Sequence, residues 1–159
     1  MIINTDLKSA SVHEAGHAVA YYLLQHKSAG IAARKEGLVF CNLVAPSSPP
    51  MGDAAGSAAE LLILGDYDKS GARKDRTNLG LSEAEYNELV KSTISFLSPY
   101  KRKIKRIHSL LLERVRRRES LDDFPPIEGP VGGMNPPDDG YTYCLILSIE
   151  EISAAVSQD

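Results

Sequence analysis

The chain has 159 residues, of which 43% are apolar and 25% charged, and its net charge is −3. These values are close to globular averages and exclude a wholly disordered chain, a collagen-like chain and a membrane bundle. The charge is uneven, because residues 101–118 hold nine lysines or arginines and one acid, whereas the other 141 residues carry a net charge of −11.

The two cysteines and the N-terminal residues favour a reducing compartment. Cys41 and Cys144 belong to no paired motif, which excludes a disulfide framework and a thiolate zinc site. The N-terminus lacks the basic start and apolar run of a secretory signal, and the longest apolar runs are too short to cross a bilayer. We therefore expect a cytoplasmic protein with no membrane span.

Helical patterns dominate the first two thirds of the chain. They predict helices over about residues 5–25, 53–64, 72–79 and 82–97, with the Pro- and Ser-rich residues 45–53 as a loop. Ser82 and Glu85 form a capping box at the start of the fourth helix. The helix over residues 53–64 has so little polar surface that we expect it to be buried.

A fifth helix is predicted from Ser98 and Pro99 onward, through the basic block. Its apolar stripe recurs every three or four residues, at Ile104, Ile107, Leu111 and Val115. We expect the basic side chains around this stripe to be solvated or to pair with the acidic remainder of the chain. A surface for nucleic acid or an anionic membrane is the alternative, but the block contains no aromatic residue for base stacking.

The β-structure predicted from the sequence is small. Ile31–Arg34 and Leu38–Phe40 flank a Lys-Glu-Gly turn and predict a β-ribbon. Residues 121–140 contain five prolines and four glycines and predict a linker or a draped surface loop. Residues 141–147 predict a strand, and a second capping box at 148–151 opens a short C-terminal helix. The fold class predicted is therefore mainly α with a small β-ribbon.

His13, Glu14 and His17 form an H-E-x-x-H pattern within the first predicted helix. Residues four apart share a helix face, so both imidazoles can reach one Zn²⁺. Glu14 lies beside that face, where it can take a proton from the water that the metal activates. The alternative is a helix with two unrelated histidines on one face. We expect His26 and His108, which have no such spacing, to be surface or packing residues.

The zinc site predicted in this way needs a third ligand. A catalytic zinc usually has three protein ligands and one position open to water. No H-x-x-G-x-x-H continuation follows the motif, which argues against the metzincin arrangement. From the residues alone, the candidates are acids near predicted helix ends, namely Glu60, Asp66, Asp68 and Asp75.

His13–Leu24, with the sequence HEAGHAVAYYLL, resembles the zinc helix of the FtsH-type metalloproteases, the ATP-dependent proteases of bacterial, mitochondrial and chloroplast membranes. Two further motifs follow in the family's order. Ala55–Glu60 resembles its A-G-R-A-A-E helix, and Ser70–Asp75 resembles its S-G-A-x-N-D segment. Leu111–Asp123 is similar to the family's last helix. The resemblance covers about residues 10–123.

The resemblance implies a zincin-like helical zinc endopeptidase. His13, His17 and Asp75 would hold Zn²⁺, and Glu14 would be the catalytic base. We assign Glu60 to structure or to orienting a ligand histidine through its free N–H. In the family, a strand beside the zinc pairs with substrate backbone, so the ribbon is either a substrate-binding strand or an ordinary hairpin that seals the core.

These observations predict a peptidase-like domain over residues 1–123, a Pro/Gly-rich loop or linker over 124–140, and a strand–helix tail over 141–159 docked on the same domain. The expected substrates are unfolded or flexible polypeptides, cleaved without ATP because no G-x-x-x-x-G-K-[ST] pattern for a P-loop occurs in these residues. No nucleic-acid partner is expected. The family's hexameric rings point to a homo-oligomer or a separate ATPase as partner.

A second interpretation is a peptidase-like interaction module, an adaptor or regulatory subunit with weak turnover or none. Lys74 favours it, because this cation stands where the family commonly has an asparagine before the ligand aspartate. The intact H-E-x-x-H pattern favours the enzyme.

Overall fold

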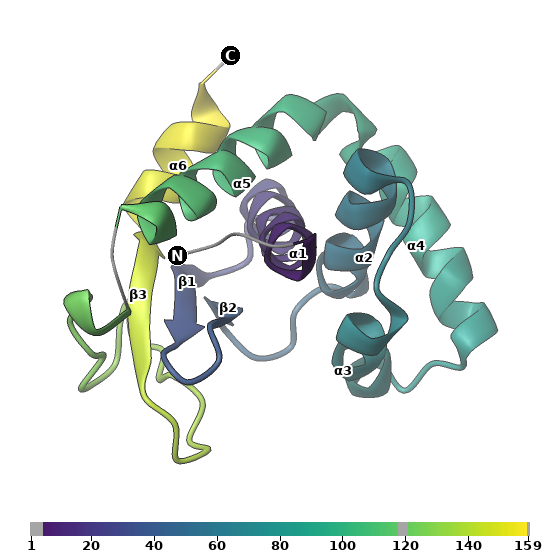
Figure 1. Ribbon diagram of the computed structural model, residues 1–159. Coiled ribbons are helices and arrows are strands. Elements are labelled where there is room, and N and C mark those ends of the chain that lie inside the picture. The colour runs from purple at the N-terminus through teal and green to yellow at the C-terminus, as the bar shows by residue number, and fades with distance from the viewer. Residues whose placement is uncertain (1–4, 118–120, 159) are drawn as a thin grey trace.

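The structure, a computed structural model, describes residues 5–117 and 121–158 (Figure 1). The helices are α1 (Thr5–Leu23), α2 (Pro50–Leu64), α3 (Lys69–Leu79), α4 (Glu83–Leu97), α5 (Lys101–Arg116) and α6 (Ile149–Ser157). The strands are β1 (Ser28–Arg34), β2 (Val39–Val44) and β3 (Tyr143–Ser148), and short 3₁₀ turns cover Ser98–Tyr100 and Leu121–Asp123. The mainly helical fold with a small β-structure is confirmed.

Two predicted boundaries are wrong by a few residues. Helix α2 begins at Pro50, inside the segment predicted as a loop, because proline is tolerated in the first turn, where its missing N–H is not needed. Helix α3 begins at Lys69, since the Asp68 side chain accepts a hydrogen bond from the Ser70 N–H and caps it. Both predicted capping boxes, at residues 82–85 and 148–151, are present.

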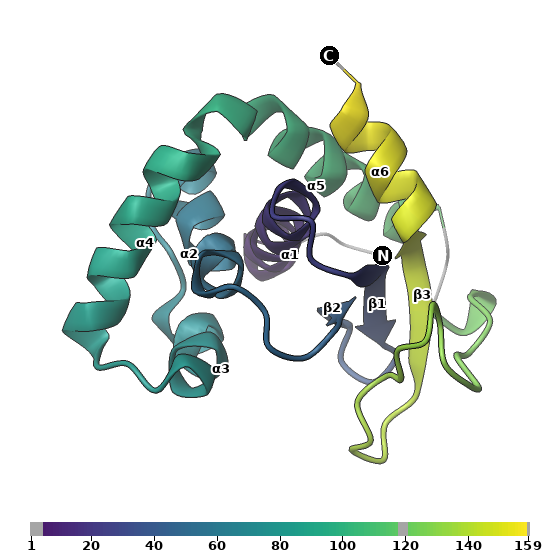
Figure 2. The same cartoon turned by 180° about the vertical axis from the view of Figure 1, so that it is seen from behind.

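Helix α1 runs through the middle of the molecule. In Figures 1 and 2 it lies between α2 on one side and α5 on the other, with the sheet beside it. Val12, Ala15, Val19 and Ala20 are all fully buried, so α1 is enclosed on most of its circumference. The histidines of α1 therefore lie inside the protein rather than on a solvated helix face.

Small residues bring α2 unusually close to α1. A β-carbon at position 16 would lie 2.4 Å from the Ala59 Cβ and 2.5 Å from the Ala55 carbonyl oxygen. A β-carbon at position 56 would lie 2.4 Å from Nε2 of His13. Since real β-carbons do not approach other atoms so closely, glycine at both positions is what permits this helix contact.

The sheet is larger than the predicted ribbon. Strand β1 pairs antiparallel with β2, as predicted, and also with β3, which gives the order β2-β1-β3. Ala33 faces Phe40 on one side and Cys144 on the other. The predicted strand over 141–147 thus completes the sheet from the far end of the chain, and β2 is an edge strand.

The Pro/Gly-rich segment lies over the sheet. Ile127, Val131 and Met134 pack against a small apolar cluster formed by the strand residues Ala29, Ala32, Leu43 and Tyr143. This cluster is separate from the main core, which the helices share with residues such as Ile31 and Ile146. Residues 124–140 therefore cover a strand cluster that the helices leave open.

Part of the basic block holds the C-terminal helix. Lys103 donates to the carbonyls of Val156 and Gln158, and Arg106 donates to the Ala155 carbonyl at 2.6 Å. Arg114 donates to the Ile146 carbonyl at 3.0 Å and pairs with Glu151. Most of these partners are main-chain carbonyls near the end of α6, because the last carbonyls of a helix lack internal donors. Other basic side chains of the block are exposed or pair with acids, as expected.

Candidate metal centre

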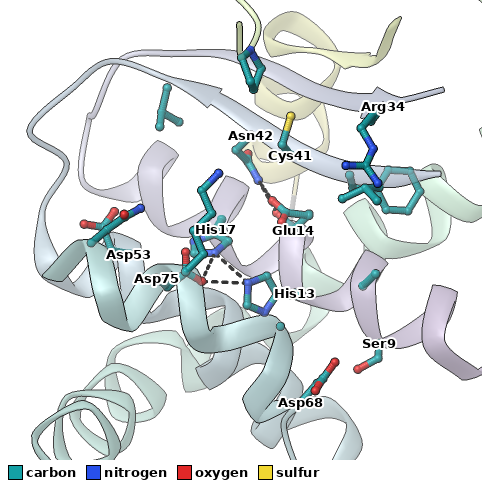
Figure 3. Close-up of a pocket in the computed structure, with 18 of the residues that line it drawn as sticks. Ser9, His13, Glu14, His17, Arg34, Cys41, Asn42, Asp53, Asp68 and Asp75 are labelled. Atoms are coloured by element: carbon teal, nitrogen blue, oxygen red, sulfur yellow. Dashed lines mark hydrogen bonds and ion pairs between the residues drawn. The ribbon is translucent and has the colours of Figure 1, made fainter. Parts of the chain in front are cut away.

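Two helices bring three donor atoms together. Nε2 of His13 and Nε2 of His17, one turn apart on α1, lie 3.1 Å from each other. Oδ2 of Asp75 on α3 lies 3.0 Å from the first nitrogen and 3.2 Å from the second. Figure 3 shows these side chains converging from the two helices, with Asp75 facing both rings.

The donor set matches what Zn²⁺ requires. Zinc binds imidazole nitrogen and carboxylate oxygen at about 2.0–2.2 Å in tetrahedral geometry, which places neighbouring ligand atoms about 3.3 Å apart. The three distances here, 3.0, 3.1 and 3.2 Å, are close to the edges of one face of such a tetrahedron. His13, His17 and Asp75 can therefore hold one zinc ion with a fourth position open.

The outer nitrogens of both rings are held by acceptors. Nδ1 of His13 lies 2.8 Å from Oε2 of Glu60, and Nδ1 of His17 lies 2.8 Å from the Gly52 carbonyl oxygen. Because a carbonyl and a carboxylate only accept, both Nδ1 atoms carry the hydrogen. Each Nε2, which faces Asp75, is then the ring nitrogen that can bind a metal once it has released its own proton.

Electrostatics at this point favour positive charge. Burial lowers the pKa of His13, but the hydrogen bonds to Asp75 and Glu60 outweigh it and raise that pKa to about 10. Burial also lowers the pKa of His17, but the charge of Asp75, the hydrogen bond to it and the charge of Glu14 together raise that pKa. Burial opposes ionisation of Asp75, yet the two histidines hold its pKa far below the usual range. The centre thus stabilises the protonated form of both rings beside the ionised Asp75 carboxylate.

Glu14 lies beside the three donors, and its carboxylate is near enough to both histidines to share a metal ion with them. One of its carboxylate oxygens is within 4.8 Å of a ring nitrogen of each histidine. Its Oε2 accepts a 2.6 Å hydrogen bond from Nδ2 of Asn42 on β2. Sequence reasoning missed Asn42, and the only signal for it was a polar residue within the otherwise apolar strand Val39–Val44.

The structure separates the four candidates for the third ligand. Among them, Asp75 has an oxygen within 3.2 Å of both histidines. Glu60, which is 1% exposed, contacts the outer nitrogen of His13 and also accepts from Ser9. Asp68 caps α3, and Asp66 accepts from the Tyr67 N–H in an exposed turn. Only the first of these arrangements places an oxygen between the histidines.

The two remaining histidines lie apart from the centre. His26 bonds to the Ala45 carbonyl, and His108 on α5 bonds to the buried hydroxyl of Ser11. Burial and the nearby Lys8 charge lower the pKa of His108, opposite to the shift at the centre. Both behave as packing residues.

The donor atoms open into a cleft of about 1380 Å³. Helix α1 forms its floor, and residues of β2 and α3 line its sides. In Figure 3, Asp53 lies at one end of the cleft and Arg34 at the other, with the histidines between them. This volume exceeds the roughly 300–1,000 Å³ typical of small-molecule sites.

No protein-family model matches the chain, and a comparison with curated proteins found no match. The resemblance to FtsH-type proteases therefore depends on the motifs of the sequence itself and stays a hypothesis. Within the described residues, none of the helices combines the length and the apolarity that crossing a bilayer demands.

Proposed function

We propose that the protein is a zincin-like, zinc-dependent endopeptidase that hydrolyses unfolded or flexible polypeptides without ATP. The observation that carries the proposal is the triangle of His13 Nε2, His17 Nε2 and Asp75 Oδ2, with edges of 3.0–3.2 Å. The acceptors behind both histidines support it, since metal-binding histidines usually donate their other N–H to such a group.

The proposed hydrolysis gives the metal ligands and Glu14 separate roles. Zinc at this position supplies Lewis-acid activation of water and of the scissile carbonyl. Glu14, beside the donors, takes the proton of the attacking water and returns it to the leaving amine. The Glu14 carboxylate is free to act as a base, because the two histidines and Asp75 already provide three ligands.

The substrate class follows from the shape of the cleft. Edge strand β2 lines it and can add an extended segment by main-chain hydrogen bonds, which makes binding tolerant of sequence. A stably folded protein rarely exposes such a segment, because its backbone opens only by local unfolding. The expected substrates are therefore unfolded chains and flexible loops of proteins in the cytoplasm.

Metal analysis and a digest test the proposal together. Protein purified without chelator should hold about one zinc per chain, as a three-ligand site implies. His17→Ala should lose the metal, whereas the matched variant His26→Ala should keep it. Equal zinc in the wild type and in a His13/His17 double variant would contradict the metal assignment.

The digest compares casein-like unfolded substrate with a stable folded domain, each with and without ATP. Wild type should cut only the unfolded substrate, at a rate that ATP does not change. Glu14→Gln should retain zinc and fold but lose activity by at least about 100-fold, as expected on loss of a general base. ATP-stimulated cleavage by the pure protein would contradict the proposal.

One observation favours the interaction module as the second candidate. Lys74 lines the cleft next to Asp75, and its charge reaches Cys41 across the cleft, where it opposes the rise in the thiol pKa caused by burial. The positive charge of Lys74 acts against a zinc ion at the centre, although solvent screens it because the side chain is exposed. Bound zinc without cleavage of either substrate would favour the module over the enzyme.

A further inference from the structure

Asn42 directs both of its N–H donors to one residue. Its Nδ2 atom donates to the main-chain carbonyl of Glu14 at 3.0 Å and to the Glu14 carboxylate at 2.6 Å. A primary amide has two N–H groups, so its whole donor capacity is used on Glu14. Figure 3 shows the bond to the carboxylate, which joins α1 to strand β2.

The other end of the same amide is left without a partner. The Oδ1 atom of Asn42 is buried and accepts no hydrogen bond within the described residues. Such an acceptor is costly, and an amide normally turns to satisfy it. Turning this amide would bring its oxygen against two acceptors, the carbonyl and the carboxylate of Glu14. The amide therefore sits in the orientation that suits an ionised Glu14.

The contact also distinguishes the two carboxylate oxygens. Oε2 accepts from Asn42, whereas Oε1 has no hydrogen-bond partner in residues 5–117 and 121–158. A glutamate side chain has three rotatable bonds, and a clamp on its carboxylate and its own carbonyl removes most of that freedom. One oxygen is thus held, and the other is left to take a proton.

We propose that Asn42 is a positioning residue that clamps Glu14 through Oε2 and so presents Oε1 as the proton-accepting oxygen in the cleft. This inference deepens the proposed function, on which it rests. Because Asn42 belongs to the edge strand that lines the cleft, the clamp ties the position of the base to the strand beside which the substrate lies.

Kinetics test the clamp with a matched control. Asn42→Leu should keep zinc and lower kcat by about 10- to 100-fold with KM changed little, because a displaced base costs rate rather than binding. Asn135→Leu removes an exposed amide outside the cleft, and should leave kcat within about twofold. Unchanged kcat in zinc-loaded Asn42→Leu, with an active wild type, would overturn this inference alone.

A second variant separates positioning from a structural role. Asn42→Asp keeps the size of the side chain but replaces the donating N–H groups by a carboxylate, which repels the Glu14 carboxylate. It should lower kcat at least as much as Asn42→Leu, with KM changed little. A residue needed only for packing would tolerate a change of equal size, so an unchanged kcat would count against the clamp.

A third measurement does not depend on turnover. In NMR spectra, Glu14→Ala should move the side-chain amide signals of Asn42 and leave those of Asn78 and Asn87 in place. Unmoved Asn42 signals would overturn the inference even if the enzyme is active. If the wild type binds no zinc or cuts no substrate, the proposed function fails, and these signals still decide whether Asn42 holds Glu14.

Discussion

Helix α1 carries two histidine contacts of opposite character on its two sides. Toward α2 and α3, the ring of His13 lies between two carboxylates, Glu60 and Asp75, and its pKa is raised to about 10. Toward α5, the ring of His108 meets the hydroxyl of Ser11 and a nearby lysine charge, and its pKa is lowered. The acidic partners, rather than burial or the imidazole itself, account for the raised pKa of His13.

The packing of the two sides differs in the same way. Glycine and alanine line the contact with α2, so the helices approach closely and the rings have one fixed place. The contact with α5 is filled by large side chains such as Ile107 and Leu111, both fully buried. The first side is specialised for holding polar groups in position, and the second supplies apolar burial.

The largest effects are expected from variants that change the size of a side chain on either side of α1. Leu111→Ala should lower stability by about 2–5 kcal/mol, the usual result of a core cavity, but should leave zinc binding intact. Gly56→Ala should lower stability by about 1–3 kcal/mol through overpacking and abolish zinc binding, because its β-carbon displaces the ring of His13. Urea unfolding and metal analysis of both variants measure these effects.

The control for the glycine change is Gly129→Ala, since nothing lies within 4 Å of a β-carbon at that position. It should retain both stability and zinc. Loss of zinc in Leu111→Ala but not in Gly56→Ala would reverse the comparison between the two sides of α1.

The pH dependence of zinc binding should sharpen the electrostatic contrast. With a metal-free pKa raised from 6.5 to about 10, His13 is protonated at pH 7–9 and must release one proton when its Nε2 binds zinc. Because the pKa of His17 is raised as well, zinc affinity should rise by at least about tenfold per pH unit over this range. Competition with a chelator of known affinity measures the slope.

Glu60→Gln is the matched variant for the pH experiment. It removes one of the two carboxylates that keep His13 charged, so less proton release and a flatter slope are expected. A pH-independent affinity in the wild type would show that His13 is already neutral and would remove the electrostatic contrast with His108.

The relative importance of the two carboxylates forms the next prediction. Asp75→Asn should weaken zinc by about 10-fold or more, because it removes a charged oxygen from the metal's own ligands. Glu60→Gln should weaken zinc less, since this carboxylate acts through the outer nitrogen of His13. The reverse order, measured by the same chelator competition, would make Glu60 the ligand.

The smallest effect is expected on the α5 side. Arg114→Met removes the pair with Glu151, in which both side chains are about one third exposed (33% and 38%), and the hydrogen bond to the Ile146 carbonyl. Because such a pair contributes about 0.2–1 kcal/mol and a hydrogen bond about 0.5–1.5 kcal/mol, stability should fall by about 1–2 kcal/mol and zinc should stay bound. The exposed Lys105→Met should change neither quantity. A loss of zinc in Arg114→Met would link the two sides of α1.

Much of the fold followed from local patterns. The four-residue spacing of His13 and His17 fixes them on one face of α1, and the two capping boxes form as written because each involves residues three apart. The stripe from Ile104 to Val115 is buried as its period predicts. The errors lie at the ends of helices: α2 and α3 begin a few residues earlier than composition indicates, because a proline and a capping aspartate allow the earlier start.

Contacts between distant segments were beyond the reach of such patterns. Strand β3 pairs with β1 across more than a hundred residues, so the ribbon was predicted one strand too small. The Gly52 carbonyl that orients His17 belongs to the backbone, and any residue type could have supplied it. The clamp by Asn42 depends on the register of β2 against α1, which no periodicity encodes.

The sequence by itself determined which residues have the chemistry for a zinc site: two histidines one helical turn apart with a glutamate between them, because helix geometry is local. It left four acids open for the third position, and the choice of Asp75 came from the family resemblance. Only the tertiary structure brings Asp75 within 3.2 Å of both rings and places Glu60 behind His13. The reason is that the contacts among α1, α2 and α3 join side chains that are distant in the sequence.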